Sequence, residues 1–213
     1  MAARFAARNQ LTITIGSLLI PIISGCIVFI LLYSTAPAQT PISEVAAAVT
    51  QPTPVQAAAP LPELKPPVRL AINTVNIDAP VKPTGLTADG DMAVEDSITD
   101  VAWYSLGFKP GQIGSAVIAG HYGWKAGQPS VFNPLQDLKP GDILTSYDSD
   151  GKAISFSVTS TRIYRPDADA AEVFSSTDGI AHLNLITCEG TWDAATKSYT
   201  DRLVVFSDII KTP

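Results

Sequence analysis

Residues 182–190 read HLNLITCEG, a short apolar run that ends at Cys188, the cysteine of the C-terminal half. Two runs of the same kind are SAVIAGHYG at 115–123 and DRLVVFS at 201–207. Short apolar runs with β-branched residues, interrupted by Gly, Pro and Asp, are typical of a β-barrel or β-sandwich. We therefore predict a single all-β domain over residues 68–213. Its predicted strands are 68–72, 75–78, 115–119, 142–147, 153–164, 182–187 and 202–207.

Two connections in this domain have a recognisable local pattern. Asp150-Gly151 lies between two predicted strands and is typical of a tight hairpin turn. Residues 131–138, VFNPLQDL, predict one short helical turn. No long amphipathic helix and no internal repeat is evident in the sequence.

Residues 11–33 form an uncharged stretch of different character, LTITIGSLLIPIISGCIVFILLY. A helix of this length would extend about 34 Å, enough to cross the ~30 Å hydrocarbon core of a bilayer. We predict a transmembrane anchor here. Arg4 and Arg8 precede it and no Lys or Arg follows until Lys65. The positive-inside rule then places residues 1–10 in the cytoplasm and the C-terminal domain outside, as in a single-pass protein of the cell membrane.

A cleaved signal peptide is the alternative interpretation of the N-terminus. Ala36-Pro37-Ala38 has the small residues of a cleavage site, although the apolar run is longer than in most signal peptides. In either case the domain is exported. Residues 34–67 are rich in Pro and Ala without a hydrophobic period, so we predict a disordered stalk between membrane and domain.

Charge and cysteine content narrow the possible functions of the exported part. Residues 68–213 hold 11 Lys and Arg against 18 Asp and Glu, which argues against nucleic acid or anionic lipid as a partner. The second cysteine, Cys26, lies in the predicted membrane span, so a disulfide with Cys188 is implausible. Cys188 is then an unpaired thiol outside the cell, a liability unless it is buried or used.

Three side chains at the ends of predicted strands have the chemistry of acyl transfer. Cys188 is the candidate nucleophile, because a thiolate can form a thioester that is later displaced. His121 is the candidate proton donor to the leaving amine, and Arg202 the candidate stabiliser of the oxyanion. No acidic residue is an obvious partner for His121, so the pattern does not indicate a Cys-His-Asp triad.

Each of these residues also has a purely structural interpretation. Cys188 alone would suit an inert buried thiol, His121 a turn, and Arg202 an ion pair with Asp201. Arg202 alternates with apolar residues, however, and a charge on an apolar strand face needs a partner or a purpose. His182 lies six strand residues before Cys188, or ~20 Å away, and is expected to be an ordinary residue at a strand start.

Taken together, the three segments resemble the sortase family. The resemblance rests on Gly120-His121 after an apolar strand, on the tetrad Leu185-Ile-Thr187-Cys188, and on Arg202 followed by an apolar strand. Trp103-Tyr104 and Pro110-Gly111 add to it, and it covers about residues 68–210. The tetrad by itself is moderately specific, whereas the three pieces in this order behind an N-terminal anchor are strong evidence.

The resemblance implies a closed eight-stranded β-barrel and a cysteine transpeptidase. It implies cleavage of an LPXTG-like sorting signal between Thr and Gly, followed by transfer to an amine of a peptidoglycan precursor or a pilin lysine. Cys188, His121 and Arg202 take the family roles of nucleophile, general acid and oxyanion or substrate-binding residue. Thr187 matches a position that contributes to substrate binding. The short layout of anchor, stalk and domain looks most like the class D, E or F sortases.

Cofactors and alternative activities are further expectations. The reaction needs no cofactor, although acidic loops bind calcium in some sortases. Two alternatives are a thiol hydrolase on the same scaffold, in which water resolves the thioester, and a non-catalytic β-barrel that binds a partner at the cell surface. The acidic groups considered as calcium ligands are Asp89, Asp91 and Asp96, or Asp167, Asp169 and Glu172.

Overall fold

The computed structural model describes residues 3–6, 63–125 and 127–211 of the protein. The predicted membrane span at 11–33 and nearly all of the predicted stalk lie outside these residues. Among the helices that the model does describe, none combines the length and the apolar composition that a membrane crossing requires.

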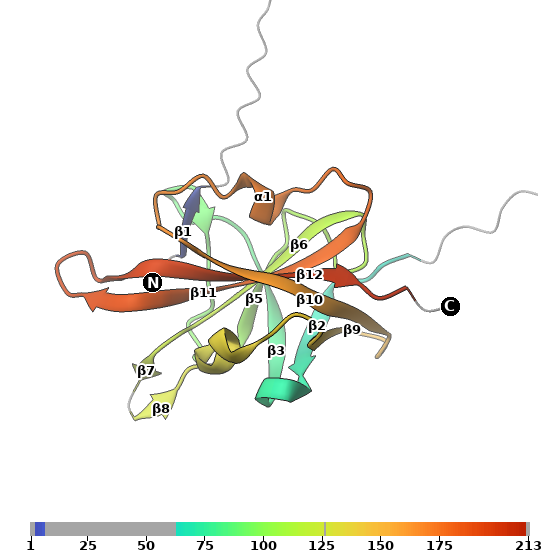
Figure 1. Ribbon diagram of the computed structural model, residues 1–213, viewed down its shortest axis with the longest axis horizontal. Helices are drawn as coiled ribbons and strands as arrows, with labels where there is room; N and C mark the ends of the chain where they lie inside the picture. The colour runs from blue at the N-terminus through green and yellow to red at the C-terminus, as the bar shows by residue number, and fades with distance from the viewer. Residues whose placement is uncertain (1–2, 7–62, 126, 212–213) are drawn as a thin grey trace, which may run out of the picture. The chain divides into compact units, whose positions relative to one another are not determined.

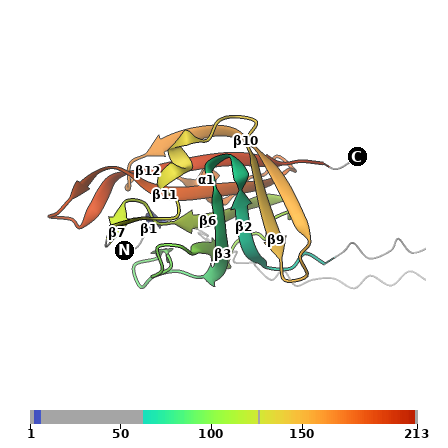
Figure 2. The ribbon, with the colours of Figure 1, turned by 90° about the horizontal axis from the view of Figure 1, so that it is seen from below.

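Eight strands close into a barrel, which confirms the predicted fold class (Figure 1). The strands are β2 (Pro67–Ile72), β3 (Ile77–Thr84), β5 (Val101–Tyr104), β6 (Gly114–Gly120), β9 (Ile143–Asp148), β10 (Ala153–Tyr164), β11 (Ala181–Asp193) and β12 (Ser198–Ile209). Their order around the barrel is β10-β12-β11-β6-β5-β3-β2-β9. In Figure 2, β2, β3 and β9 run steeply across the direction of β11 and β12, as strand tilt in a small barrel requires.

Short elements complete the domain. The 3-10 helix η1 (Asn73–Val75) precedes β3, η2 (Asn133–Asp137) follows β8, and α1 (Ala171–Phe174) lies between β10 and β11. The helical turn predicted at 131–138 is therefore confirmed by η2. Two small sheets pair β1 (Ala3–Ala6) with β4 (Asp91–Met92) and β7 (Trp124–Lys125) with β8 (Gln128–Pro129).

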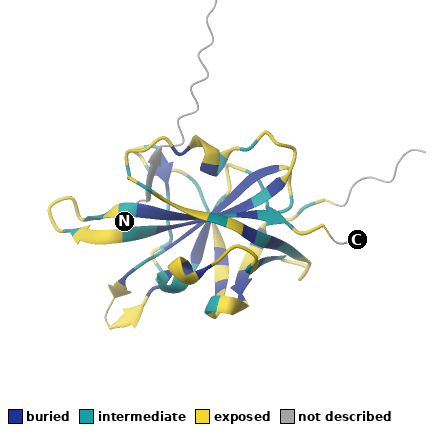
Figure 3. Ribbon diagram, in the orientation of Figure 1, coloured by how far each residue is buried: buried dark blue, intermediate teal, exposed yellow. Residues whose placement is uncertain are grey.

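The side chains of β11 alternate between two apolar clusters, one on each face of the barrel wall. Leu183 and Leu185 point into the barrel, where they belong to the main core with residues from the other strands. Ile186 points outward and packs with Val204 in a second cluster, which α1 and the β4 region cover from outside. Figure 3 shows the resulting pattern, with buried positions concentrated along the crossing strands and exposed positions at the hairpin tips.

The structure also corrects several strand boundaries. The strand predicted at 75–78 begins at Ile77 and continues to Thr84, past Pro80 and Pro83. These prolines are tolerated because β3 pairs with β2 only over its first half and with β5 only over its second. β5 itself was absent from the predicted strands. β11 and β12 extend well beyond the predicted 182–187 and 202–207, because they form one long hairpin.

Candidate functional site

Three neighbouring strands bring the three candidate residues to one level of the barrel wall. β11 pairs with β12 so that Cys188 lies opposite Arg202. β11 pairs in parallel with β6, and Ile186 lies beside Ala119. Continuing this register by two residues places His121, just past the end of β6, beside Cys188. With strands ~4.8 Å apart, the backbones of His121 and Arg202 flank that of Cys188 at about 10 Å from each other.

Arg202 is almost completely buried, with 1% of its surface exposed. Its Nη1 donates to the carbonyl oxygens of Tyr199 and Asp201 at 3.1 and 2.8 Å, and its Nη2 donates to the Ser198 hydroxyl at 3.1 Å. The Nε–H is also buried, and it has no hydrogen-bond partner among the described residues. Burying a charged donor without an acceptor costs free energy. The Nε–H of Arg202 is therefore a strong donor that an added acceptor could satisfy.

Cys188 is a half-buried free thiol. Burial raises the pKa of the Cys188 thiol above its ordinary value of 9.0, and the Arg202 guanidinium offsets part of this rise. The thiol form therefore dominates near neutral pH. Among the described residues, no hydrogen bond joins Cys188 to His121.

Backbone contacts determine where the His121 ring lies. Its Nε2 contacts the main-chain oxygen of Glu95 at 2.5 Å, and because a carbonyl only accepts, Nε2 is the donor. In the neutral ring Nδ1 is then the nitrogen without a hydrogen, and no described residue makes a hydrogen bond to it. The buried Phe132 ring packs directly on Gly120, where a Cβ would lie 2.5 Å from a ring carbon, and Phe132 N donates to the His121 carbonyl oxygen.

Thr187 is buried, and its hydroxyl donates to the carbonyl oxygen of Gly120 at 2.9 Å. This hydrogen bond joins β11 to the last residue of β6, directly before Cys188 on one strand and His121 on the other. The structure thus shows a positioning contact for Thr187, while its direct contact with a substrate stays a prediction.

Sequence reasoning missed the groups that hold these side chains. Glu95, Tyr199 and Asp201 act through main-chain oxygens, and any residue type could supply those. The sequence gave no reason to pair Ser198 with Arg202, because Ser198 lies four residues away on an exposed hairpin. Only the folded backbone reveals these partners.

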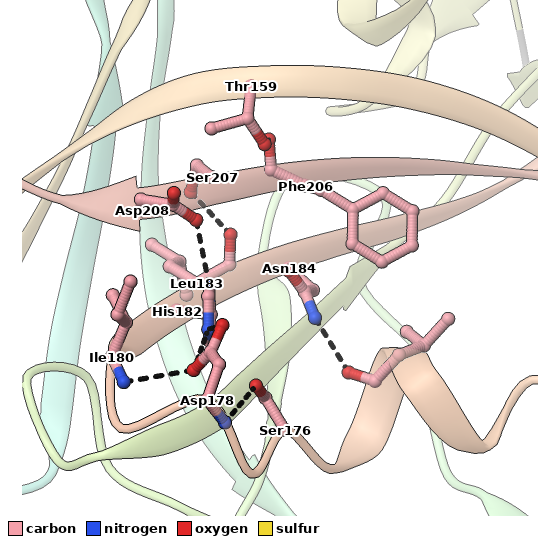
Figure 4. A network of polar contacts seen from close by, with 11 residues as sticks. Thr159, Ser176, Asp178, Ile180, His182, Leu183, Asn184, Phe206, Ser207 and Asp208 are labelled. Atoms are coloured by element: carbon pink, nitrogen blue, oxygen red, sulfur yellow. Dashed lines mark hydrogen bonds and ion pairs between the residues drawn. The ribbon is translucent and has the colours of Figure 1, made fainter.

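His182 belongs to a separate polar network at the start of β11 (Figure 4). Its Nδ1 contacts Asp208 at 2.8 Å and its Nε2 contacts Asp178 at 3.0 Å. Burial tends to lower the pKa of His182, but the hydrogen bonds to Asp178 and Asp208 outweigh it and leave the pKa above 6.5. The pKa of Asp178 is lowered to about 2, first by the Ile180 amide and then by His182. His182 is thus a structural ion-pair residue, remote from Cys188 as expected.

The acidic loops do not gather into a metal site within residues 63–125 and 127–211, where no three metal-ligating side chains converge. Several of the carboxylates that were candidates for calcium have other contacts. Glu172 binds Arg162 and Tyr164, Asp167 contacts Arg165, and Asp169 accepts from the Ala171 amide.

Comparison with known proteins agrees with the barrel fold. The Sortase domain family model matches residues 70–210. Sortase C-1 of Actinomyces oris superposes with a TM-score of 0.54 at 19% identity, covering 68% of this chain and 73% of that one. Sortase C1 of Streptococcus agalactiae superposes with a TM-score of 0.53 at 19% identity, covering 68% of this chain and 67% of that one. The lid mutant of sortase A from Corynebacterium diphtheriae superposes with a TM-score of 0.53 at 19% identity, covering 71% of this chain and 73% of that one. No curated protein matches the sequence. At these identities the structural likeness shows the fold alone.

The electrostatics of Cys188 lead to a testable pH dependence. We expect iodoacetamide to alkylate Cys188 with a midpoint above pH 9.0, because burial disfavours the thiolate. Arg202→Met should move the midpoint still higher, since the thiolate loses its neighbouring cation, whereas Arg202→Lys should keep it closer to that of the unsubstituted protein. Arg165→Met, at an exposed ion pair, is the control and should leave it unchanged. A lower midpoint in folded Arg202→Met would contradict this account.

The His182 network predicts a pH dependence of stability. Because the folded pKa of His182 is raised, its contribution is complete below about pH 6.5 and is lost as the pH rises through the folded value. The lowered pKa of Asp178 contributes above about pH 3.8 and is lost as the pH falls towards 2. His182→Gln should therefore lower the urea midpoint more at pH 5 than at pH 8.5. Lys152→Gln, on the β9–β10 turn, should change both midpoints alike. An equal or larger loss for His182→Gln at pH 8.5 would refute the assignment.

Proposed function

The chain belongs to the sortase family of cysteine transpeptidases, and we propose that it cleaves an LPXTG-like sorting signal between Thr and Gly and transfers the acyl group to an amine. The observation that supports this proposal is the common level of His121, Cys188 and Arg202 on three adjacent strands. A surface protein with such a signal is the proposed donor. A peptidoglycan precursor or a pilin lysine is the proposed acceptor.

The first half-reaction forms a thioester. Because burial favours the thiol form of Cys188, the sulfur has to lose its proton as it attacks, and the free Nδ1 of His121 is the group proposed to accept it. The carbonyl oxygen of the substrate becomes an oxyanion. When the C–N bond breaks, His121 returns the proton to the leaving amine, which departs neutral.

Arg202 is proposed to stabilise that oxyanion. Its Nη groups are held by the hairpin backbone and by Ser198, so the guanidinium is oriented before substrate arrives. Its Nε–H has no hydrogen-bond partner in the part of the chain that the structure describes, and it is the donor that a developing negative charge would satisfy. Because Nε is buried in this structure, the hairpin has to shift slightly before a substrate oxygen can reach it.

In the second half-reaction an amine attacks the thioester and Cys188 is released. Neither half-reaction as proposed requires a metal or cofactor, and a calcium site in the acidic loops would be regulatory. The assignment to class D, E or F stays a prediction.

We propose that residues 11–33 anchor the chain in the cell membrane with the barrel outside. In that topology residues 3–6 lie on the cytoplasmic side and cannot pair with β4 of the same chain, so the β1–β4 pairing would be absent after insertion. Protease added to intact cells should remove the barrel and leave residues 1–10 protected. Cleavage of both parts would refute the topology.

The function is tested by incubating the full chain with LPXTG and LAXTG peptides and an amine, and following Cys188 adducts and products by mass. We expect an acyl adduct on Cys188, no adduct in Cys188→Ala, and amide product. Arg202→Lys should lower kcat/KM about 10²- to 10³-fold, because lysine lacks the planar fork of donors. Arg165→Lys is the matched control.

Absence of both adduct and turnover with every sorting peptide would count against the enzyme. An adduct that yields only free acid, even at high amine concentration, would favour the hydrolase. Near-normal activity of Arg202→Lys would rule out the oxyanion role for Arg202.

A further inference from the structure

A cavity of about 240 Å³ lies on the outer face of the barrel, at the end of β11 away from Cys188. Four neighbouring strands, β6, β11, β12 and β10, form its floor, and α1 with the loop that follows it forms one side. His182 lines the cavity, and six strand residues, or ~20 Å, separate it from Cys188. The cavity is therefore separate from the candidate active site.

Strand register gathers the lining side chains into two rows. In the first row, Ser115 of β6 lies beside His182 of β11, which lies opposite Asp208 of β12. The same register places Asn184 opposite Phe206 in the second row. Figure 4 shows His182 and Asn184 along β11 with Phe206 and Asp208 along β12. Because side chains two residues apart on a strand point to the same face, both rows face the cavity.

Two polar atoms in these rows are buried without a hydrogen-bond partner among the described residues. They are the Oδ1 of Asn184 and the Oγ of Ser115, in residues that are only 1% and 2% exposed. The Nδ2 of Asn184 donates to the Val173 carbonyl oxygen at 2.7 Å, so Oδ1 is the atom left over, and it can only accept. Burying such atoms without partners costs free energy, which a ligand with hydrogen-bonding groups would recover.

The charged side chains of the cavity already have ionic partners. Arg162 Nη1 contacts Glu172 at 2.7 Å, and His182 Nδ1 contacts Asp208 at 2.8 Å. These four are the charged residues among the described residues that line the cavity. An ionic ligand would compete with these existing pairs, so the cavity favours a neutral one. The remaining polar lining is neutral and consists of Ser115, Thr159, Ser160, Ser175, Ser176 and Asn184.

A ring that carries several hydroxyl groups meets these requirements. A hydroxyl both donates and accepts, so it can donate to Asn184 Oδ1 and also bond to a serine hydroxyl. Phe206 supplies apolar surface for the C–H groups of such a ring, beside the Arg162 guanidinium that lies 5.0 Å from the Phe206 centroid. The volume of about 240 Å³ is far larger than the ~30 Å³ of one water and below the ~300–1,000 Å³ of sites for drug-sized ligands. It suits a single sugar ring.

We propose that this cavity binds a pyranose, either free or as the terminal residue of a glycan. Asn184 Oδ1 accepts from one ring hydroxyl, the Ser115 hydroxyl bonds to another, and Phe206 packs against the C–H groups. Because both polar atoms are covered in this structure, the loop after α1 has to shift slightly to admit the ring. Binding makes and breaks no covalent bond and does not use Cys188, so the inference is independent of the proposed function.

The test measures binding of the methyl glycosides of glucose, galactose, mannose and N-acetylglucosamine to the full chain by saturation-transfer difference NMR. The detergent must have no sugar head group, because such a group would compete. We expect a Kd of about 1–10 mM for at least one glycoside, since so small a ligand makes few contacts. Ser115→Ala should raise this Kd about three- to tenfold through the loss of one neutral hydrogen bond. Cys188→Ala should leave it unchanged.

Two further variants guard against an effect on folding. Ser115→Ala should keep the urea midpoint, because the hydroxyl that it removes has no partner among the described residues. Ser160→Ala, next to Phe206 on β10, should raise the Kd about two- to threefold. The control is Ser146→Ala, at a buried serine of β9 outside the cavity, which should keep the Kd.

Tetrahydropyran-2-methanol has the same ring shape with one hydroxyl and should bind at least about tenfold more weakly than the sugar. Equal binding of this compound would overturn the proposal, as would an unchanged Kd in both Ser115→Ala and Ser160→Ala. No saturable binding of any of the four glycosides would mean that only water satisfies the two buried atoms, and would also overturn it. A trisaccharide that binds at least as well as its terminal sugar would support a glycan end as the ligand, and weaker binding of the trisaccharide would support a free sugar.

Discussion

The pairing of β11 with a parallel neighbour on one side and an antiparallel neighbour on the other is the constraint on which the rest of the site depends. It places Cys188 opposite Arg202 across one pair and, when the register of the other pair is continued two residues past Ile186 and Ala119, beside His121. A slip of one residue in either strand pair would turn the Cys188 side chain to the face of the barrel wall opposite to Arg202 or His121. The register is held by alternation of apolar side chains between two clusters and by the bond from Thr187 to the Gly120 carbonyl oxygen. The barrel core therefore determines the geometry of the site.

Burial has two opposed consequences at this site. It disfavours the thiolate of Cys188, so the thiol form dominates near neutral pH. It also confines the Arg202 charge to a place of low polarity. There, three hydrogen bonds to the hairpin compensate only part of the cost, and Nε has no partner among the described residues. A negative charge that develops between these two groups would relieve the cost of burying Arg202. In the proposed mechanism this charge is the oxyanion of the transition state, which the site would then stabilise more than it stabilises the bound substrate.

The two histidines of the chain lie at different positions along one sheet and have different surroundings. His182 lies at the start of β11, where Asp178 and Asp208 neutralise its charge and consume both ring nitrogens. His121 lies just past the other end of the neighbouring strand, where a backbone oxygen holds one ring nitrogen and no described residue hydrogen-bonds to the other. Apolar residues such as Ile186 and Val204 separate the two ends. Titration of His182 is therefore expected to affect folding and not chemistry.

Local sequence determined the all-β class, most strand positions and the η2 turn, because period-two alternation and turn residues are legible in a few residues. It also placed His182 outside the site from strand length alone. The roles of Cys188, His121 and Arg202 stay predictions from their motifs. β5 and the second half of β3 were missed. β5 is only four residues long, and the prolines of β3 argue against a strand unless it is known that each half of β3 pairs on one side only. Only the tertiary structure decided that Arg202 is buried, that Glu95 orients His121 and that polar groups from four strands and the loop after α1 line one cavity. Those features depend on main-chain atoms and on contacts between segments up to about a hundred residues apart, which no local pattern encodes.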